Sequence, residues 1–148
     1  DLPPREALYT RKDVVAAVTP FPAIEVLDTR YSDSKTVSAE ERIADNFLNG
    51  GFVYGAAVGN WRALDLSQLK VNLSVSGKTI VERVGGHPTI DPLIPAVALA
   101  NEFRLREGLK AGQLVTTGSC TGLNYAMPGD TVVATFEHLG SASLTFTR

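Results

Sequence analysis

The sequence has few of the residues that build disulfides, soft metal clusters and membrane spans. It contains one cysteine, one methionine, one tryptophan and two histidines in 148 residues. The single Cys120 excludes an intrachain disulfide and an all-cysteine zinc site, and it fits a reducing cytoplasm. No apolar stretch approaches the ~18 residues that a bilayer span needs, and no signal peptide is recognisable. We therefore expect a cytoplasmic protein without a membrane partner.

The charge balance excludes another class of partner. Fourteen basic and sixteen acidic residues leave a formal net charge of −2. This balance argues against a nucleic-acid surface or a polybasic membrane contact. The length suffices for one domain with its own core, so we predict a single domain over residues 1–148. Because Asp1 stands where an initiator methionine would be, we expect the chain to be a processed or cut product.

Capping patterns predict the helices. Thr10 is a plausible N-cap for a helix through residues 13–18. Ser38 and Glu41 have the spacing of a capping box, which predicts a helix running toward residues 44–46. Asp91 is expected to cap the longest helix, which a glycine at position 108 would end.

Apolar runs and period-two alternation predict the strands. Ser76 and Gly77 supply the turn of the clearest hairpin. The expected strands cover residues 21–27, 52–58, 71–75, 79–84, 113–117, 131–137 and 142–147. No linker, repeat or low-complexity segment interrupts them. The pattern predicts an α+β domain that is rich in mixed and antiparallel strands.

Glu25 is an acidic residue inside an apolar run, residues 21–27. Carboxylates are rarely buried unless they are paired or bind a metal. Strand alternation places Glu25 on one face with Ala23 and Leu27, where a core side chain would normally lie. Two interpretations remain open on these residues alone: an ion pair with Arg30 or another base, and a metal ligand.

Two further segments carry clustered polar side chains. In residues 43–46, Asp45 and Asn46 meet the expected end of a helix, where helix capping is the ordinary explanation. Residues 116–122 combine hydroxyl side chains with two glycines at the end of an expected strand. Such a segment lets the backbone approach an anionic ligand closely, although a plain glycine-rich turn would have the same composition.

Cys120 and His87 are weaker candidates. Cys120 would act as a nucleophile only beside a base, and a buried structural thiol is the simpler interpretation. His87 stands between Gly86 and Pro88 without a second histidine or cysteine at metal-binding spacing. A hydrogen-bonded structural role is therefore expected for it.

Five motifs occur in a specific order along the chain, at residues 23–31, 43–46, 115–122, 128–130 and 136–141. Together they resemble the 2-keto-4-pentenoate hydratase and 4-oxalocrotonate decarboxylase family of the fumarylacetoacetate hydrolase superfamily. The similarity covers the C-terminal part of that family only. It implies a β-rich roll of mixed and antiparallel strands with a few flanking helices. It also implies a Mg²⁺ or Mn²⁺ site, with Glu25 as a metal ligand.

The same resemblance implies which residues contact the substrate and which are missing. Asn46, Thr117 and Ser119 would bind it. The family's E-x-E carboxylate pair and catalytic lysine lie in a preceding part that nothing here replaces, so the catalytic residues remain unknown. Where hydratases commonly carry a substrate-facing serine, this chain has Leu48, which cannot orient water.

The implied activity is that of a lyase in a longer parent enzyme, and activity of the 148-residue chain itself is left open. We expect a metal-dependent hydratase acting on a 2-oxo or 2-hydroxydienoic acid from meta-cleavage of aromatic compounds, working as a homo-oligomer. The alternatives are a 2-oxo acid decarboxylase, an acylpyruvate-type C–C hydrolase and a non-catalytic scaffold fragment.

Overall fold

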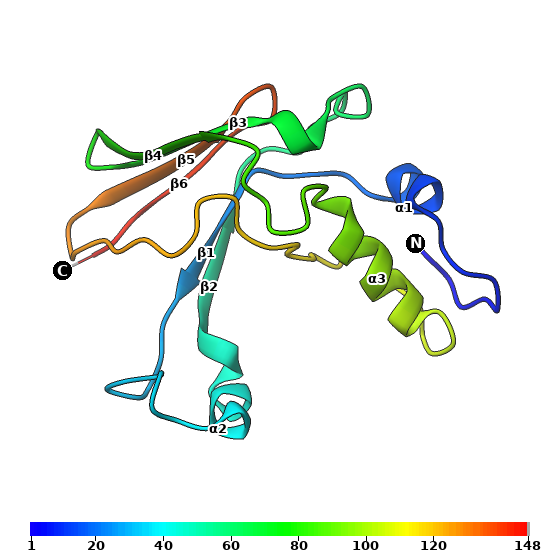
Figure 1. Ribbon diagram of the computed structural model, residues 1–148, viewed down its shortest axis with the longest axis horizontal. Helices are drawn as coiled ribbons and strands as arrows, with labels where there is room; N and C mark the ends of the chain where they lie inside the picture. Colours follow the sequence, from blue (N-terminus) through cyan, green and yellow to red (C-terminus); the bar gives the residue numbers. More distant parts are fainter. Residues whose placement is uncertain (148) are drawn as a thin grey trace.

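A computed structural model describes residues 1–147 of the chain. It consists of a four-stranded sheet, a two-stranded arm that carries a short helix, and a pair of packed helices (Figure 1). The helices are α1 (Arg11–Ala17), α2 (Ala39–Ala44) and α3 (Leu93–Phe103), with short 3₁₀ turns η1 (Asn46–Leu48) and η2 (Leu66–Gln68). The strands are β1 (Ala23–Leu27), β2 (Asn49–Tyr54), β3 (Lys70–Val75), β4 (Lys78–Val84), β5 (Thr131–Phe136) and β6 (Gly140–Thr145).

Two of the three predicted helix starts, at Thr10 and Ser38, are confirmed by reciprocal capping contacts. The Thr10 hydroxyl accepts the Asp13 amide at 3.2 Å, and the Asp13 carboxylate accepts the Thr10 amide at 2.8 Å. Ser38 and Glu41 repeat this arrangement at the start of α2. Each box satisfies backbone donors that the first helical turn leaves without partners. These starts are local features, which is why the sequence reveals them.

The four-stranded sheet has the order β4-β3-β5-β6. The predicted hairpin is confirmed: Ser76 and Gly77 both have positive φ, as a tight two-residue turn requires. The inward face is in register, with Leu73 opposite Ala134 and Val75 opposite Val132. The expectation of mixed strands is wrong, because every strand pair within residues 1–147 is antiparallel.

Strands β1 and β2 form a separate antiparallel pair that extends from the sheet as an arm, with α2 at its far end (Figure 1). The strand expected at 52–58 is in fact β2, three residues earlier at its start. It ends at Tyr54 because Pro20 and Pro22, opposite the next residues, have no N–H to donate to a continued ladder. At Gly55 the backbone meets the Ser141 carbonyl so closely that no side chain fits there.

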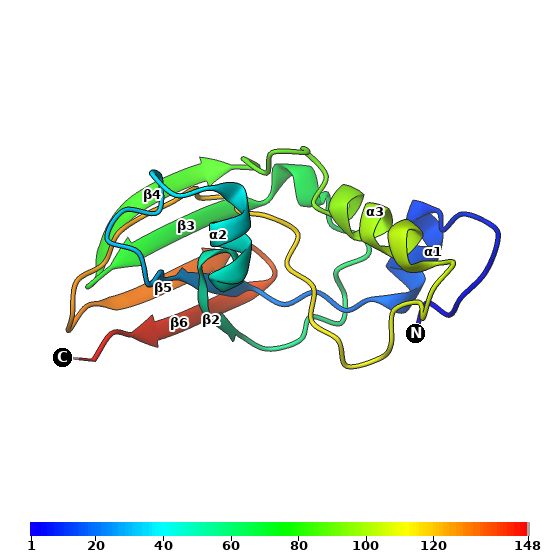
Figure 2. The same cartoon turned by 90° about the horizontal axis from the view of Figure 1, so that it is seen from below.

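Helices α1 and α3 pack against each other at the opposite end of the molecule from β6 (Figure 2). Their core contains Leu2, Tyr9, Val14 and Ala100. The Asn101 side chain fixes the Tyr9 backbone by accepting its N–H at 2.8 Å and donating to its carbonyl at 3.0 Å. The Asp91 carboxylate accepts the Leu93 amide at 3.0 Å. The expected bounds of this helix are wrong, because Pro92 and not Asp91 is its N-cap and α3 ends at Phe103, before Gly108. No helix among residues 1–147 has the length and apolarity that a membrane crossing requires.

The strand expected at 113–117 is wrong. Residues 113–119 have neither helix nor strand structure, although their composition favours a strand. A strand needs a partner at hydrogen-bonding distance, and composition does not supply one. The segment continues instead across the sheet, where Ala126 packs against the core of Leu73, Val132 and Ala134.

Candidate functional site

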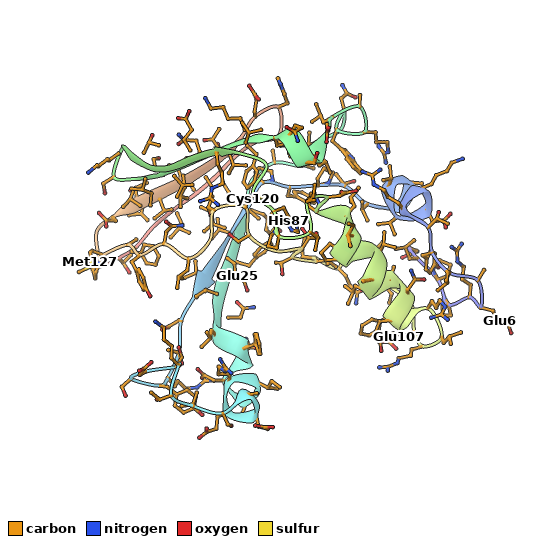
Figure 3. All side chains as sticks on the ribbon, viewed as in Figure 1. Glu6, Glu25, His87, Glu107, Cys120 and Met127 are labelled. Atoms are coloured by element: carbon orange, nitrogen blue, oxygen red, sulfur yellow. The ribbon has the colours of Figure 1, made fainter. Side chains whose placement is uncertain are left out.

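A cavity of about 1250 Å³ lies where the inward face of the sheet meets the arm and the glycine-rich segment. Leu73 and Val132 contribute the apolar floor. Glu25, Thr117 and Ser119 line the same cavity although they are far apart in sequence. Figure 3 shows Glu25, His87 and Cys120 in the central region where these elements meet. The cavity therefore combines an apolar floor with a few polar groups, as small-molecule sites commonly do.

Glu25 lies in the middle of β1, opposite Phe52 of β2. The expectation that it occupies the core face of its strand is wrong: Ile24 packs against the sheet core, while Glu25 and Leu27 are exposed. Strand β1 belongs to a two-stranded arm, and the face of β1 that meets the sheet is the one that carries Ile24. Glu25 therefore lies on the opposite face. Glu25 nevertheless lines the cavity, at a part that is open to solvent. No salt bridge of Glu25 occurs among the described residues.

Arg30 pairs with Asp45 rather than with Glu25. Its guanidinium lies 2.7 Å from the Asp45 carboxylate, whose side chain is only 4% exposed. The same carboxylate accepts the Thr29 hydroxyl at 2.6 Å and the Arg30 amide at 3.1 Å. Asp45 thus joins the end of α2 to the chain that leaves β1. This contact links two of the motifs singled out in the sequence, and it assigns Asp45 a structural function.

The turn after Asp45 has an unusual backbone. Asn46, Phe47 and Leu48 have φ values of 55°, 53° and 69°. A left-handed conformation costs a non-glycine residue roughly 1–2 kcal/mol, so neighbouring contacts must hold this turn. The Leu48 amide donates to the Asp45 carbonyl at 3.2 Å, and the Leu48 carbonyl accepts the Asp28 amide at 2.9 Å. Within the described chain, Leu48 lines the cavity and Asn46 does not, because the Asn46 amide turns toward the Asn49 carbonyl.

The Asp45 contacts predict an acid-sensitive contribution to stability. The Thr29 hydroxyl, followed by the Arg30 amide and guanidinium, lowers the pKa of Asp45 from its ordinary value of 3.8 despite burial. A lowered folded-state pKa stabilises the fold above the unfolded pKa, and this contribution disappears as pH falls through the folded value. We expect Asp45→Asn to flatten this part of the pH dependence.

The measurement is the free energy of unfolding in urea, from about pH 5 to about pH 2, for the wild type and Asp45→Asn. The wild type should lose more stability over this window than the variant. Asp13 and Asp130, which also have lowered pKa values, are present in both proteins, so their effect cancels in the difference. Parallel curves would show that the Asp45 contacts contribute nothing.

In the glycine-rich segment, Ser119 is held by its own backbone. Its hydroxyl oxygen accepts the amides of Gly122 at 2.9 Å and Thr121 at 3.2 Å. The hydroxyl proton makes only long contacts within the segment, to the Gly122 carbonyl at 3.5 Å and the Thr121 hydroxyl at 3.4 Å. A ligand oxygen at normal hydrogen-bond distance would be a better acceptor for it. Thr117 is half-buried and uses its carbonyl to contact His87.

Neither His87 nor Cys120 has the surroundings of a catalytic group. Both ring nitrogens of His87 make protein contacts, with the Thr117 carbonyl on one side and Thr89 on the other. Burial raises the pKa of the Cys120 thiol, although the nearby Arg83 charge opposes this effect. A thiol that ionises less readily is a poorer nucleophile at neutral pH. The expected structural roles of both residues agree with this geometry.

The described residues do not form a complete metal site. Among them, no group of three or more histidine, cysteine, aspartate or glutamate side chains is close enough to hold an ion. Glu25 offers one carboxylate to the cavity, and Asp45 is engaged by Arg30. Because Mg²⁺ needs near-octahedral oxygen coordination, these residues fit one ligand position and not the whole site.

Sequence reasoning overlooked Trp61. Its side chain is buried and lines the cavity, and its indole N–H has no hydrogen-bond partner among residues 1–147. A buried donor without a partner is costly, so a bound ligand or water would gain by accepting from it. The only signal in the sequence is that this is the chain's single tryptophan, which does not indicate where its ring points.

Comparison with known proteins identifies relatives that are named as decarboxylases and hydratases. No protein-family model matches the chain. It is 32% identical to a 4-oxalocrotonate decarboxylase of Pseudomonas putida, over 90% of this chain and 51% of that protein. It is 30% identical to a 2-keto-4-pentenoate hydratase of Paraburkholderia xenovorans (strain LB400), over 93% of this chain and 51% of that protein.

A solved structure shares both fold and sequence with the chain. It is a 4-oxalocrotonate decarboxylase from Pseudomonas putida G7 complexed with magnesium and adipate, with a TM-score of 0.77 and 27% identity. The match covers 97% of this chain and 56% of that one. The chain spans about half the length of the curated relatives it matches. Its resemblance to the 2-keto-4-pentenoate hydratase and 4-oxalocrotonate decarboxylase family is thereby confirmed over that half.

Proposed function

We propose that the chain forms the substrate-binding part of a metal-dependent lyase acting on a 2-oxo or 2-hydroxydienoic acid, as a hydratase with a fumarylacetoacetate hydrolase-like roll. The observation that carries the proposal is the shared cavity, which is lined by Glu25 and by the hydroxyl-bearing residues Thr117 and Ser119. Relatives named as hydratase and decarboxylase support the reaction class. The unit would be the C-terminal catalytic domain of a longer enzyme.

In this proposal the glycine-rich segment binds the carboxylate or carbonyl end of the substrate. Ser119 donates its hydroxyl proton to a substrate oxygen in place of its long contact with the Gly122 carbonyl, while its own oxygen accepts two amides. The Thr117 hydroxyl and the Trp61 indole are further donors at the cavity wall. The adipate of the related decarboxylase is a dicarboxylate, which agrees with carboxylate recognition. Asn46 remains a predicted substrate contact, which would require η1 to turn its amide toward the cavity.

Among the described residues that line the cavity, Glu25 is the one proposed as a ligand of a divalent metal. Mg²⁺ is named for the related decarboxylase, and Mg²⁺ or Mn²⁺ is proposed for the parent enzyme of this chain. Such an ion polarises a 2-oxo group as a Lewis acid. Glu25 fits only one ligand position of such an ion, and the other ligands would come from outside the described residues.

Decarboxylation is the second candidate, and Leu48 favours it. This apolar side chain lines the cavity. The family resemblance implies a serine there in hydratases, and Leu carries no donor or acceptor with which to orient water. C–C hydrolysis of an acylpyruvate has less support, because both nitrogens of His87 are engaged and it cannot act as a base without losing a contact. A scaffold without ligand binding is the remaining alternative, and assembly into a homo-oligomer stays a prediction.

The test is a titration of adipate into the chain in the presence of Mg²⁺, followed by NMR of the backbone amides. We expect shifts in the 117–122 segment, and at least about tenfold weaker binding in Ser119→Ala, which loses a hydrogen bond to a charged group. Ser143→Ala is the matched control, because Ser143 lies on β6 and does not line the cavity. An absence of adipate shifts at millimolar ligand would favour the scaffold.

A further inference from the structure

His87 lies in the loop between β4 and α3 and is only 7% exposed. The Thr89 amide donates to its Nδ1 at 3.2 Å, so Nδ1 is an acceptor and the ring proton belongs to Nε2. Nε2 then donates to the Thr117 carbonyl at 2.9 Å. The ring thus links two segments: its Nδ1 accepts from Thr89 of its own loop, and its Nε2 donates to the Thr117 carbonyl of the glycine-rich segment.

The two loops also touch at their glycines. A Cβ placed on Gly118 would lie 2.9 Å from His87 Nε2, and Gly118 has a φ of +121° that side-chain-bearing residues rarely adopt. A Cβ on Gly86 would lie 2.8 Å from the Cys120 carbonyl. Both glycines are therefore needed for the close approach of the backbones. The His87 ring can lie against the backbone at Gly118 because that residue has no side chain.

Few other contacts hold the glycine-rich segment. Ser119 makes its hydrogen bonds within the segment itself. Just after the segment, the Asn124 amide donates to the carbonyls of Thr121 and Gly122. Among residues 1–147, the His87–Thr117 bond is the one hydrogen bond that ties residues 114–122 to a part of the chain distant in sequence. A loop without ladder hydrogen bonds opens at low free-energy cost. Loss of this bond would therefore leave the segment without a fixed position.

We infer that His87 is a positioning residue, which fixes the conformation in which Thr117 and Ser119 face the cavity. The inference rests on the proposed function, in which this segment binds the substrate carboxylate. His87 touches no substrate in this scheme. Its ring sets the position of the Thr117 carbonyl, and the hydroxyl groups that follow are placed as a consequence.

Cys120 offers a direct readout because it is the chain's single cysteine and lies within the segment. Its thiol is half-buried, so its reaction with a disulfide reagent such as dithionitrobenzoate reports how often the segment opens. His87→Phe keeps a ring of similar size and removes both hydrogen bonds. We expect it to accelerate the thiol reaction about tenfold, the factor for one lost hydrogen bond.

Two conservative variants separate the bond from packing. His87→Gln retains an N–H donor long enough to reach the Thr117 carbonyl, and should react within about twofold of the wild type. His87→Asn is too short to reach it and should react like His87→Phe. Hydrogen exchange should increase in peptides from residues 114–122 while β3 and β5 stay protected, which shows that the variants remain folded.

Equal thiol rates in His87→Phe, His87→Asn and wild type would overturn the inference, as would a His87→Gln variant as fast as His87→Phe. Adipate with Mg²⁺ should slow the wild-type thiol reaction if the segment binds carboxylates. If adipate gives no protection while the His87 variants still accelerate the reaction, the proposed function fails and the positioning role stands.

Discussion

Titration of Mn²⁺ into the 148-residue chain is expected to give weak binding, with a dissociation constant of about 1 mM or higher. The reason is the ligand count, since the described residues present Glu25 to the cavity without two further ligand side chains beside it. For the same reason we expect no turnover of a 2-hydroxy-2,4-dienoate above the uncatalysed rate. A longer parent enzyme should both bind the metal and turn the substrate over.

Calorimetry measures the metal binding, and the loss of dienoate absorbance measures turnover. Glu25→Gln should remove the residual binding because an amide is a much poorer ligand than a carboxylate for these ions. Glu107→Gln is the matched control, since Glu107 is an exposed glutamate beyond the end of α3, away from Glu25 (Figure 3). Micromolar Mn²⁺ binding with measurable turnover would show that residues 1–148 contain the remaining ligands and catalytic groups.

Replacement of Leu73 by alanine is expected to lower the free energy of unfolding by about 2–5 kcal/mol. Leu73 is central in β3, is 6% exposed, and packs against Val132 and Ala134 beneath the arm. Its truncation removes apolar contacts and leaves a void that neighbouring strands can fill only partly. Since small domains are stable by only about 5–15 kcal/mol, this is a large fraction of the total.

Urea unfolding of Leu73→Ala beside Leu105→Ala tests this expectation. Leu105 is 65% exposed, so the same chemical change there should alter stability by less than about 0.5 kcal/mol. Equal effects at both positions would mean that the face of β3 toward the arm is not a packed core. The cavity would then lack the rigid floor that the proposed site requires.

Part of the site was predictable from the sequence because its motifs stand out locally. The hydroxyl and glycine content of residues 116–122 predicted either a ligand-binding segment or a plain turn, and the structure shows that this segment lines the cavity with Glu25. Ligand binding by it stays a prediction. The face that Glu25 occupies was predicted incorrectly, because alternation gives the two faces of a strand but not which face meets the core. From the sequence, Asp45 was interpreted as a residue that caps the end of a helix. Its pairing with Arg30 and Thr29 could not be predicted, because it depends on a contact across the arm.

The sequence by itself determined the local elements and the family resemblance. Capping boxes and the Ser76-Gly77 turn act over three or four residues, so they do not depend on the rest of the fold. Tertiary structure alone decided what pairs across long separations. It left residues 113–117 without a strand partner and turned Ile24 rather than Glu25 toward the sheet. It also brought His87 to Thr117, because hydrogen-bond partners and buried faces are set by which distant segments pack together.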